Sequence, residues 1–481
     1  MNSKPFTILQ VNDTHAYLDL HTEYFWGARG AEYRPAGGYA RLAALVKQIR
    51  GEGPDQVLFL DNGDTLHGTY PVVQTQGKAM LPILTRLGLD GMTAHWEFAY
   101  GPETFQQRAA ELNYPVLALN VYSQRDRKLI FPPYRVKEAN GLRIGIAGLA
   151  NNIVDKMMPP SFSEGLTFDL GREELAQVVQ RLRQEEQVDL VVLLSHLGFP
   201  QDMQLVSDVP GIDICLSGHT HHRLFKPLRQ GETLLIQSGS HGSFLGRLEV
   251  TIEGSRIVDY RHELLQVEQD ISPDQEIQDL VDSALKPFQA EMKEWVGETE
   301  TPLNRAYNLE TTMDNLLLES LMESTGAQMA FSNGWRYGAP VDRGPITLND
   351  LYNIIPMNPP VSTTELSGEE LQEMLELNLE HTFSRQPYQQ MGGYVKRAMG
   401  LKVYFKVENP YPTRIQKIFV GEEELKAGAS YQVAFVTEQG VPSKFGRQRQ
   451  DTSTRAVDAM RSYLQRHKPY RGGIRGTFVL V

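Results

Sequence analysis

The chain has 481 residues, 41% apolar and 22% charged, which is the composition of an ordinary globular protein. This length suits two domains and a connector better than a single core. The net charge of −12 disfavours nucleic-acid polymers as partners, because an acidic surface gains nothing from counterion release, but a small anionic substrate remains compatible with local metal ions or arginines.

Few features bear on the compartment. Cys215 is the only cysteine, so no intramolecular disulfide can form, which favours a reducing environment. The apolar run Phe6–Val11 is short and leads directly into polar residues, unlike a signal peptide, and no run reaches the ~18 apolar residues of a membrane span. We expect a cytoplasmic protein without membrane contact, or an extracytoplasmic one if a leader was removed; the sequence identifies no protein partner.

Short apolar runs alternate with helical patterns over residues 1–265. Helical patterns cover Tyr39–Arg50 and Arg172–Gln184. Strands are predicted at Thr7–Val11, Gln56–Leu60, Val116–Leu119, Arg143–Ala147, Leu190–Leu194, Ile212–Leu216 and Leu234–Gln237. Strands that alternate with helices indicate an α/β domain.

A helical connector is predicted over residues 266–300. Ser272–Val296 is polar, helical in period and free of glycine, and Ser272-Pro273 followed by acidic residues is a typical helix start. A second domain then covers residues 301–481. Its predicted helices are Met313–Ser324 and Ser367–Leu379, and its predicted strands are Leu401–Val407, Gln416–Val420 and Tyr431–Val436.

Polar motifs follow the predicted strands of the first domain, at the points where the apolar runs end. They are Asn12-Asp13-Thr14-His15, Asn62-Gly63-Asp64, Ala94-His95-Trp96-Glu97, Ser195-His196-Leu197-Gly198 and Ser217-Gly218-His219-Thr220-His221. Because strand ends meet at one edge of an α/β sheet, we expect these side chains to converge. Mixed imidazole and carboxylate ligands suit Zn, Mn or Fe.

Asp64 is the expected bridge between two divalent ions, because a carboxylate has two oxygens. Two ions roughly 3.5–4 Å apart can hold and activate a hydroxide between them. An isolated Asp-x-His pair is mostly chance, and His196 alone would more often be a core histidine. The motifs taken together, and above all Gly218-His219-Thr220-His221, favour a metal site. No ligand role is assigned to His21, His67, His222, His241 and His262.

These motifs, with Gln237-Ser238-Gly239-Ser240-His241-Gly242, resemble the calcineurin-like metallophosphatases of the 5'-nucleotidase family. The resemblance implies a four-layer α/β/β/α metallophosphatase domain and a C-terminal α+β 5'-nucleotidase-type domain that binds substrate. It also implies one ion held by Asp13, His15, Asp64 and His221, and another held by Asp64, His95, His196 and His219. Ser332-Asn333-Gly334-Trp335-Arg336 looks like the family's substrate-binding segment, which implies roles for Asn333 and Arg336.

Two departures from the family pattern concern catalysis and base recognition. The family's Gly-Asn-His-Glu-Phe-Asp segment reads Ala94-His95-Trp96-Glu97-Phe98-Ala99 here, so the dyad of histidine and aspartate that aids the leaving group is missing. His95 replaces a metal-binding asparagine, and Asp64 and His95 are the predicted catalytic residues; His95 as a displaced acid stays an alternative. The family's aromatic Gly-Gly-Asp-Gly-[Phe/Tyr] segment is absent. Further candidates for substrate binding are Arg385, Tyr394, Arg343, Arg397, Phe405 and Phe445.

Three functions fit these patterns. The first is hydrolysis of a phosphoester, a nucleotide or related small phosphate, by a hydroxide between the metals. The second is hydrolysis at sulfur, since His95-Trp96-Glu97-Phe98-Ala99 is similar to the SoxB-type thiosulfohydrolases, whose S-sulfonate substrates need no acid for a leaving group of low pKa. The third is a catalytically weak module that binds anions, which the retained ligands disfavour.

Overall fold

The computed structural model describes residues 4–53 and 56–481. The residues before Lys4, which contribute to the expectation that no leader is present, lie outside the described residues. The chain forms two compact units, and each draws on two stretches of sequence. Unit 1 consists of Met1–Glu23 and Pro35–Pro287, and unit 2 consists of Tyr24–Arg34 and Phe288–Val481. The predicted domain limits at residues 265 and 300 stay predictions.

Unit 1 contains two large sheets. The first has the strand order β15-β14-β1-β4-β5, and the second has the order β12-β13-β11-β10-β8-β7. The strands of the first are β1 (Lys4–Val11), β4 (Val57–Asp61), β5 (Gly91–Met92), β14 (Phe244–Glu253) and β15 (Arg256–Gln266). Those of the second are β7 (Tyr134–Ala139), β8 (Leu142–Leu149), β10 (Leu190–Ser195), β11 (Ile214–Ser217), β12 (Leu228–Gln230) and β13 (Thr233–Ile236).

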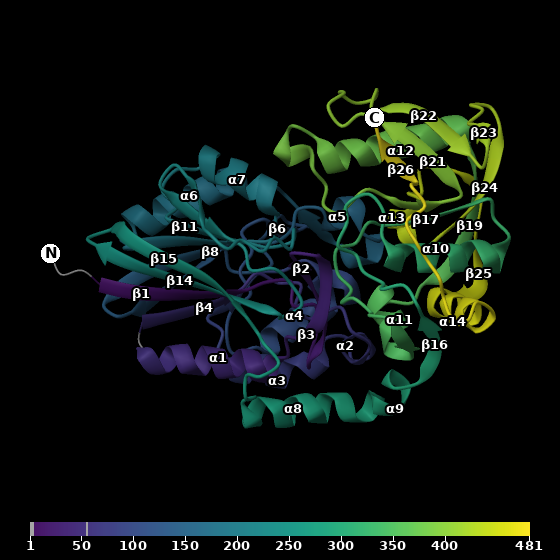
Figure 1. The fold of residues 1–481 in the computed structure, drawn as a ribbon. Helices are drawn as coiled ribbons and strands as arrows, with labels where there is room; N and C mark the ends of the chain where they lie inside the picture. Colours follow the sequence, from purple (N-terminus) through teal and green to yellow (C-terminus); the bar gives the residue numbers. More distant parts are fainter. Residues whose placement is uncertain (1–3, 54–55) are drawn as a thin grey trace. The chain divides into compact units, whose positions relative to one another are not determined.

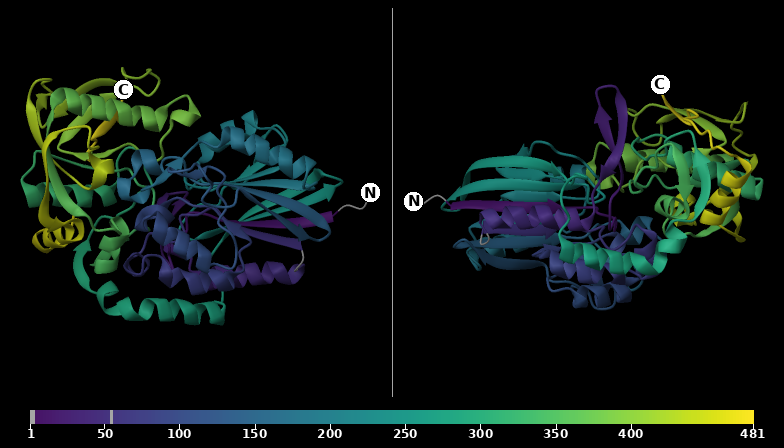
Figure 2. Two further views of the ribbon diagram at one scale, coloured as in Figure 1. Left: turned by 180° about the vertical axis from the view of Figure 1, so that it is seen from behind. Right: turned by 60° about the horizontal axis from the view of Figure 1, so that its bottom comes forward.

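One apolar core joins the inner faces of these two sheets. Ile8 and Leu60 of the first sheet and Ile146 and Val192 of the second belong to the same buried cluster. Helices cover the outer faces, with α1 (Tyr39–Glu52) and α3 (Leu81–Leu87) against one sheet and α6 (Arg172–Gln184) and α7 (Phe199–Asp208) against the other, while α8 (Gln275–Leu285) packs on α1 and α3 (Figures 1 and 2). The predicted four-layer α/β/β/α arrangement is therefore confirmed.

The register of parallel strands brings the polar motifs to one edge of each sheet. Val11 of β1 pairs with Asp61 of β4, and Ser195 of β10 pairs with Ser217 of β11. Each of these residues is the last of its strand, so the motifs that follow begin at the same level. Parallel pairing thus converts sequence motifs that are far apart into one cluster of side chains.

The predicted strand at Val116–Leu119 is wrong. Val116 makes only an isolated bridge with Met92. The backbone N–H groups of Leu117, Ala118 and Leu119 donate to carbonyl oxygens of three separate segments, so no single neighbour offers a continuous ladder. The backbone of this buried apolar run therefore forms its hydrogen bonds without belonging to a sheet. The hydrophobicity of a run does not distinguish this arrangement from a strand.

Unit 2 also combines sheets and helices. One sheet has the order β20-β17-β24-β19-β25 and another the order β23-β22-β21-β26. Besides β17, β19 and β24, their strands are β20 (Arg397–Met399), β21 (Leu401–Phe405), β22 (Ile415–Val420), β23 (Glu423–Glu424), β25 (Arg447–Arg455) and β26 (Phe478–Leu480). Its larger helices are α10 (Thr312–Thr325), α12 (Gly368–Phe383) and α14 (Ala456–Arg466). Strands β17 (Met329–Ser332), β19 (Pro360–Ser367) and β24 (Ser430–Phe435) share an apolar cluster with α12. None of the helices in the described ranges combines the length and the apolar character that a membrane span requires.

A hairpin that the sequence did not predict leaves unit 1 and joins unit 2. Its strands are β2 (His21–Gly27) and β3 (Gly30–Ala36), and residues 24–34 belong to unit 2. The Asn304 side chain donates to the Tyr33 hydroxyl at 2.9 Å, and the hydroxyls of Tyr24 and Tyr307 lie 3.4 Å apart. The chain therefore crosses between the units at residues 23–24 and 34–35 as well as at the connector.

Candidate functional site

The first group of candidate metal ligands lies beyond β1, β4 and β11. Asp13, His15, Asp64 and His221 each offer one ligand atom, and these atoms lie within 4.8 Å of one another. The Nε2 atoms of His15 and His221 are 3.2 Å apart, and Nε2 of His221 is 3.2 Å from Oδ1 of Asp13. Two imidazole nitrogens that face each other beside carboxylate oxygens are a typical donor set for a divalent ion.

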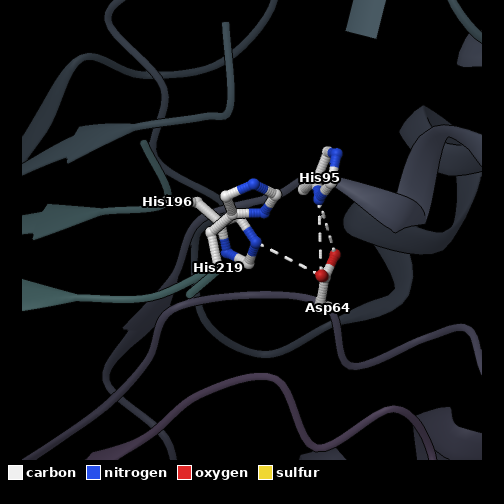
Figure 3. A group of neighbouring side chains, drawn as sticks. All are labelled: Asp64, His95, His196 and His219. Atoms are coloured by element: carbon white, nitrogen blue, oxygen red, sulfur yellow. Dashed lines mark hydrogen bonds and ion pairs between the residues drawn. The ribbon is translucent and has the colours of Figure 1, made fainter. Parts of the chain in front are cut away.

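The second group shares Asp64 with the first. It consists of Asp64, His95, His196 and His219, whose ligand atoms also lie within 4.8 Å of one another. Figure 3 shows the imidazoles gathered around the carboxylate of Asp64. His95 Nδ1 is 3.2 Å from Oδ1 of Asp64, and His196 Nε2 is 3.3 Å from Oδ2. His95 Nδ1 is also 3.3 Å from Oδ2, and His15 Nε2 of the first group is 3.7 Å from the same oxygen, so Asp64 faces ligands of both groups.

The electrostatics of these groups favour bound cations. Burial disfavours the charged form of His196, yet the carboxylates of Asp64 and Asp13 raise its pKa to about 10. Burial also opposes ionisation of Asp64, but His196 and His95 hold its pKa well below the usual range. Two buried carboxylates thus demand positive charge around them. Divalent ions would supply that charge, and the residues present fit such ions.

Most candidate ligands have backbone conformations that are rare for residues other than glycine. The φ angles are 51° for Asp13, 46° for His15, 56° for Asp64, 68° for His219 and 56° for His221. Left-handed conformations of this kind cost free energy and are found where function requires a particular side-chain direction. The strained turns directly after the strands direct these side chains toward the shared centre.

Hydrogen bonds from residues next to the candidate ligands hold the ligand loops in place. The Asn62 amide donates to the carbonyls of Ser195 and Leu216, which ties the end of β4 to the ends of β10 and β11. Glu97 accepts backbone N–H groups from Asp64, Thr65, Leu66 and His95. Both oxygens of Glu97 are therefore occupied as acceptors, so this side chain supports the loop of Asp64 and is a poor proton donor.

Trp96 and Ala99 occupy the positions of the family's missing dyad. The Trp96 backbone N–H donates to Oδ1 of Asp64 at 2.7 Å, and its indole ring stacks on His67 with ring centroids 4.8 Å apart. An indole N–H is too weak an acid to protonate a leaving group, and Ala99 has no polar side chain. In place of the dyad, the aromatic side chain of Trp96 lies beside the second group of candidate ligands.

In unit 2, the sequence-predicted residues Asn333, Arg336 and Tyr394 surround one glycine turn. Arg336 donates to the carbonyl of Gly393 at 2.8 Å, and its guanidinium carbon lies 5.0 Å from the centroid of the Tyr394 ring. A Cβ added at Gly393 would lie 3.8 Å from Oδ1 of Asn333. The three side chains are half-buried, and Arg336 brings positive charge to this turn.

The other arginine and aromatic candidates lie in different surroundings. Arg385 is exposed and donates to the carbonyl of Glu408, and Arg343 is exposed and donates to the carbonyl of Glu300. Arg397 is buried and pairs with Asp314 at 2.9 Å, so it holds the interior of unit 2 together. Phe405 and Phe445 are core residues.

Sequence reasoning missed several residues beside the metal groups. The sequence places Glu97 in a motif and makes it a candidate proton donor, but its four backbone contacts depend on loop geometry. His21, Glu23 and His241 form a third group of candidate ligand atoms within 4.8 Å of one another. His241 lies in the quoted motif that follows β13, but nothing in the sequence pairs it with residues of the hairpin.

Two family models match successive parts of the chain. Residues 6–223 match calcineurin-like phosphoesterases, and residues 292–437 match the 5'-nucleotidase C-terminal domain. A protein of Bacillus subtilis named trifunctional nucleotide phosphoesterase YfkN is 24% identical over 86% of this chain, which spans only 30% of that relative's length.

Solved structures of Thermus thermophilus share the fold over nearly the whole chain. A 5'-nucleotidase precursor has a TM-score of 0.87 and 25% identity, with 99% of both chains covered. The sulfate thiohydrolase SoxB has a TM-score of 0.90 and 23% identity, with 99% of this chain and 96% of SoxB covered. At this identity the likeness to SoxB concerns the fold alone.

Proposed function

Because the chain is a calcineurin-like metallophosphatase with a 5'-nucleotidase C-terminal domain, and thus a hydrolase, we propose that it cleaves a phosphoester with two divalent ions. The proposed substrate is a nucleotide or a related small phosphate, so the enzyme would take part in nucleotide catabolism. The ions would be Mn, Zn or Fe, which accept mixed imidazole and carboxylate ligands.

The shared position of Asp64 is the observation that carries this proposal. It belongs to both groups of ligand atoms, and its carboxylate lies 3.2 Å from His95 of one group and 3.7 Å from His15 of the other. Two ions at these groups would activate water and neutralise charge on the transferred phosphoryl group. A single structural ion would need no carboxylate that faces two sets of ligands.

The residues of the chain would divide the remaining tasks. Asp13, His15 and His221 bind one ion, and His95, His196 and His219 bind the other. Glu97 holds the backbone of the Asp64 loop in place through its four hydrogen bonds. In unit 2, Arg336 would bind non-reacting oxygens of the substrate, since a guanidinium pairs with phosphate through two parallel hydrogen bonds. Asn333 and Tyr394 are the proposed neighbours of that contact.

A substrate panel on protein loaded with Mn²⁺, Zn²⁺ or Fe²⁺ tests the proposal. The panel contains nucleoside 5'-monophosphates, cyclic nucleotides, aryl phosphates and S-sulfonated thiols. We expect turnover of phosphoesters that disappears on chelation and returns on addition of the ion. Turnover of S-sulfonated thiols without turnover of any phosphoester would contradict the proposal.

Hydrolysis of an S-sulfonate is the second candidate function. The presence of Trp96 in place of a dyad residue favours it. No dyad is present there to protonate an alkoxide leaving group, and a sulfur leaving group of low pKa departs without that help. The panel separates the two candidates directly, because the same metal-loaded protein meets both classes of substrate. Arg336 would bind sulfonate oxygens in the same way as phosphate oxygens.

A further inference from the structure

The third group of candidate ligands lies at the base of the β2–β3 hairpin. His21 and Glu23 belong to the start of β2, and His241 and Ser243 belong to the loop between β13 and β14. Glu23 and His241 are buried, with 1% and 5% of their surface exposed, and Ser243 is fully buried. The site is built within unit 1, although the next residue after Glu23 already belongs to unit 2.

The two ring nitrogens of His21 have different neighbours. Nδ1 lies 3.0 Å from the carbonyl oxygen of Asp19, which only accepts, so this nitrogen carries a proton. Nε2 lies 3.1 Å from the Ser243 hydroxyl, so Nε2 is the ring nitrogen that is available as a ligand.

The Ser243 hydroxyl lies between His21 and Glu23. It donates to Oε2 of Glu23 at 2.9 Å. The ligand atoms of His21, Glu23 and His241 all lie within 4.8 Å of one another, so the three side chains can hold one divalent cation.

The atoms around this point have the spacing of a metal site. His241 Nδ1 is 3.0 Å from Oε2 of Glu23, and His21 Nε2 is 4.0 Å from the same oxygen. Tetrahedral zinc with bonds of ~2.0–2.1 Å places its ligand atoms roughly 3.3 Å apart, within this interval. Two imidazoles and one carboxylate are a common zinc donor set, with the Ser243 oxygen or water in the fourth position.

Two neighbouring contacts are consistent with such a site. Arg223 donates to Oε1 of Glu23 at 3.0 Å, so it uses the other carboxylate oxygen and leaves Oε2 directed toward the histidines. His241 has a φ of 59°, as rare for histidine as the conformations of the other candidate ligands. A bound ion would offset the cost of that backbone conformation.

We propose that His21, Glu23 and His241 form a third divalent-cation site, suited to zinc, that fixes the base of the β2–β3 hairpin. This site is separate from the two groups that share Asp64 and does not depend on the proposed reaction. The His241 backbone N–H donates to the carbonyl of Asp13 at 2.8 Å. Loss of the third ion therefore loosens the loop of a ligand in the first group and weakens metal binding there by a few-fold.

Metal analysis of the full-length protein tests the site. The apo protein is dialysed against Zn²⁺, washed, and its zinc content per chain is measured together with anomalous diffraction at the zinc edge. We expect three zinc ions per chain in the natural protein and two in His21→Gln, with the anomalous peak between His21 and His241 absent from the variant. His262→Gln, the same change at a half-buried histidine of β15, should keep three.

A second variant separates loss of the ion from loss of the fold. Glu23→Gln removes the charge of the ligand but also its ion pair with Arg223, whereas His21 is half-buried and tolerates glutamine more readily. Both variants should lose the same single ion and keep the other two. A natural protein without an anomalous peak between His21 and His241, or a His21→Gln variant that keeps this peak, would overturn the site.

Discussion

The candidate ligands of unit 1 are nearly all buried, and most have strained backbone, whereas Asn333, Arg336 and Tyr394 of unit 2 are half-buried around one glycine turn. In unit 1, each ligand follows the end of one of five strands, and Glu97 also holds the backbone of Asp64 and His95. In unit 2, the corresponding side chains depend on one loop and on a few contacts such as that between Arg336 and Gly393.

This difference separates two kinds of residue in one hydrolase. Buried ligands with strained backbone have no alternative position, so a change there should remove metal and activity together. Half-buried side chains on a turn can move, so a change there should alter substrate affinity and leave the metals in place. The variants and the substrate series below test whether changes in unit 1 affect metal binding and catalysis while changes in unit 2 affect substrate binding.

Asp64→Ala is expected to have the largest effect. It removes the only carboxylate that belongs to both groups, so at least one ion should be lost and turnover should fall by at least ~10²–10³-fold. Elemental analysis and kinetics on the same sample measure both effects. Asp126→Ala, at an exposed aspartate, is the control and should change neither. Two tightly held ions in Asp64→Ala would rule out the bridging role.

The leaving group should control the rate strongly in the natural protein. Trp96 and Ala99 provide no proton, and general acid help is worth ~10²–10⁴ in rate, so phosphate monoesters should react more slowly as the pKa of the leaving group rises. Aryl phosphates should therefore react faster than nucleoside 5'-monophosphates. The triple variant His95→Asn, Trp96→His and Ala99→Asp should flatten this dependence. A flat dependence in the natural protein would reveal another proton donor.

Glu97→Gln should weaken metal binding without removing a ligand. The glutamine amide would place its NH₂ group against backbone N–H donors of the Asp64 loop. Supports behind metal ligands typically contribute 10–100-fold to affinity, so we expect a loss of about that size. A competition titration with a chelator measures it. Unchanged affinity would show that the loop keeps its position without this brace.

Much of unit 1 could be predicted from the sequence, because its motifs follow apolar runs whose parallel pairing gives one meeting point. Val116–Leu119 shows the limit of that reasoning, since an apolar run need not join a ladder. The strained φ angles of Asp13 and His219 and the pairing of Glu23 with His241 depend on contacts between distant segments. No local pattern encodes them.

Unit 2 was less predictable for a related reason. The hairpin residues Tyr24–Arg34 belong to unit 2, although more than 250 residues of sequence separate them from the rest of that unit, which begins at Phe288. The sequence makes Arg397 a candidate for substrate binding, and only its contact with buried Asp314 reveals a structural role. Charge and residue type do not distinguish a buried arginine from a substrate-binding one.

Arg336→Ala should affect the substrate and not the metals. A charge-assisted hydrogen bond contributes about 1.5–3 kcal/mol, so kcat/KM should fall by about tenfold or more while the metal content stays the same. Arg385→Ala, at an exposed arginine that contacts the Glu408 carbonyl, is the matched comparison and should have a smaller effect. An unchanged kcat/KM in Arg336→Ala would remove this residue from the substrate site.

His95→Asn should have the smallest effect, because it restores the residue type that the family uses as a ligand at this position. His95 Nδ1 lies 3.2 Å from Asp64, and an asparagine oxygen can bind the same ion. We expect both ions to remain and activity to stay within about tenfold, a change of ~1.4 kcal/mol in the barrier. His67→Asn, beside Trp96 but outside both ligand groups, is the matched control for metal content.

A His95→Asn variant that keeps both ions but loses activity only toward substrates with poor leaving groups would identify His95 as the proton donor. The same kinetic series used for the natural protein distinguishes the two roles, since loss of a ligand slows all substrates and loss of an acid slows only those whose leaving group needs a proton.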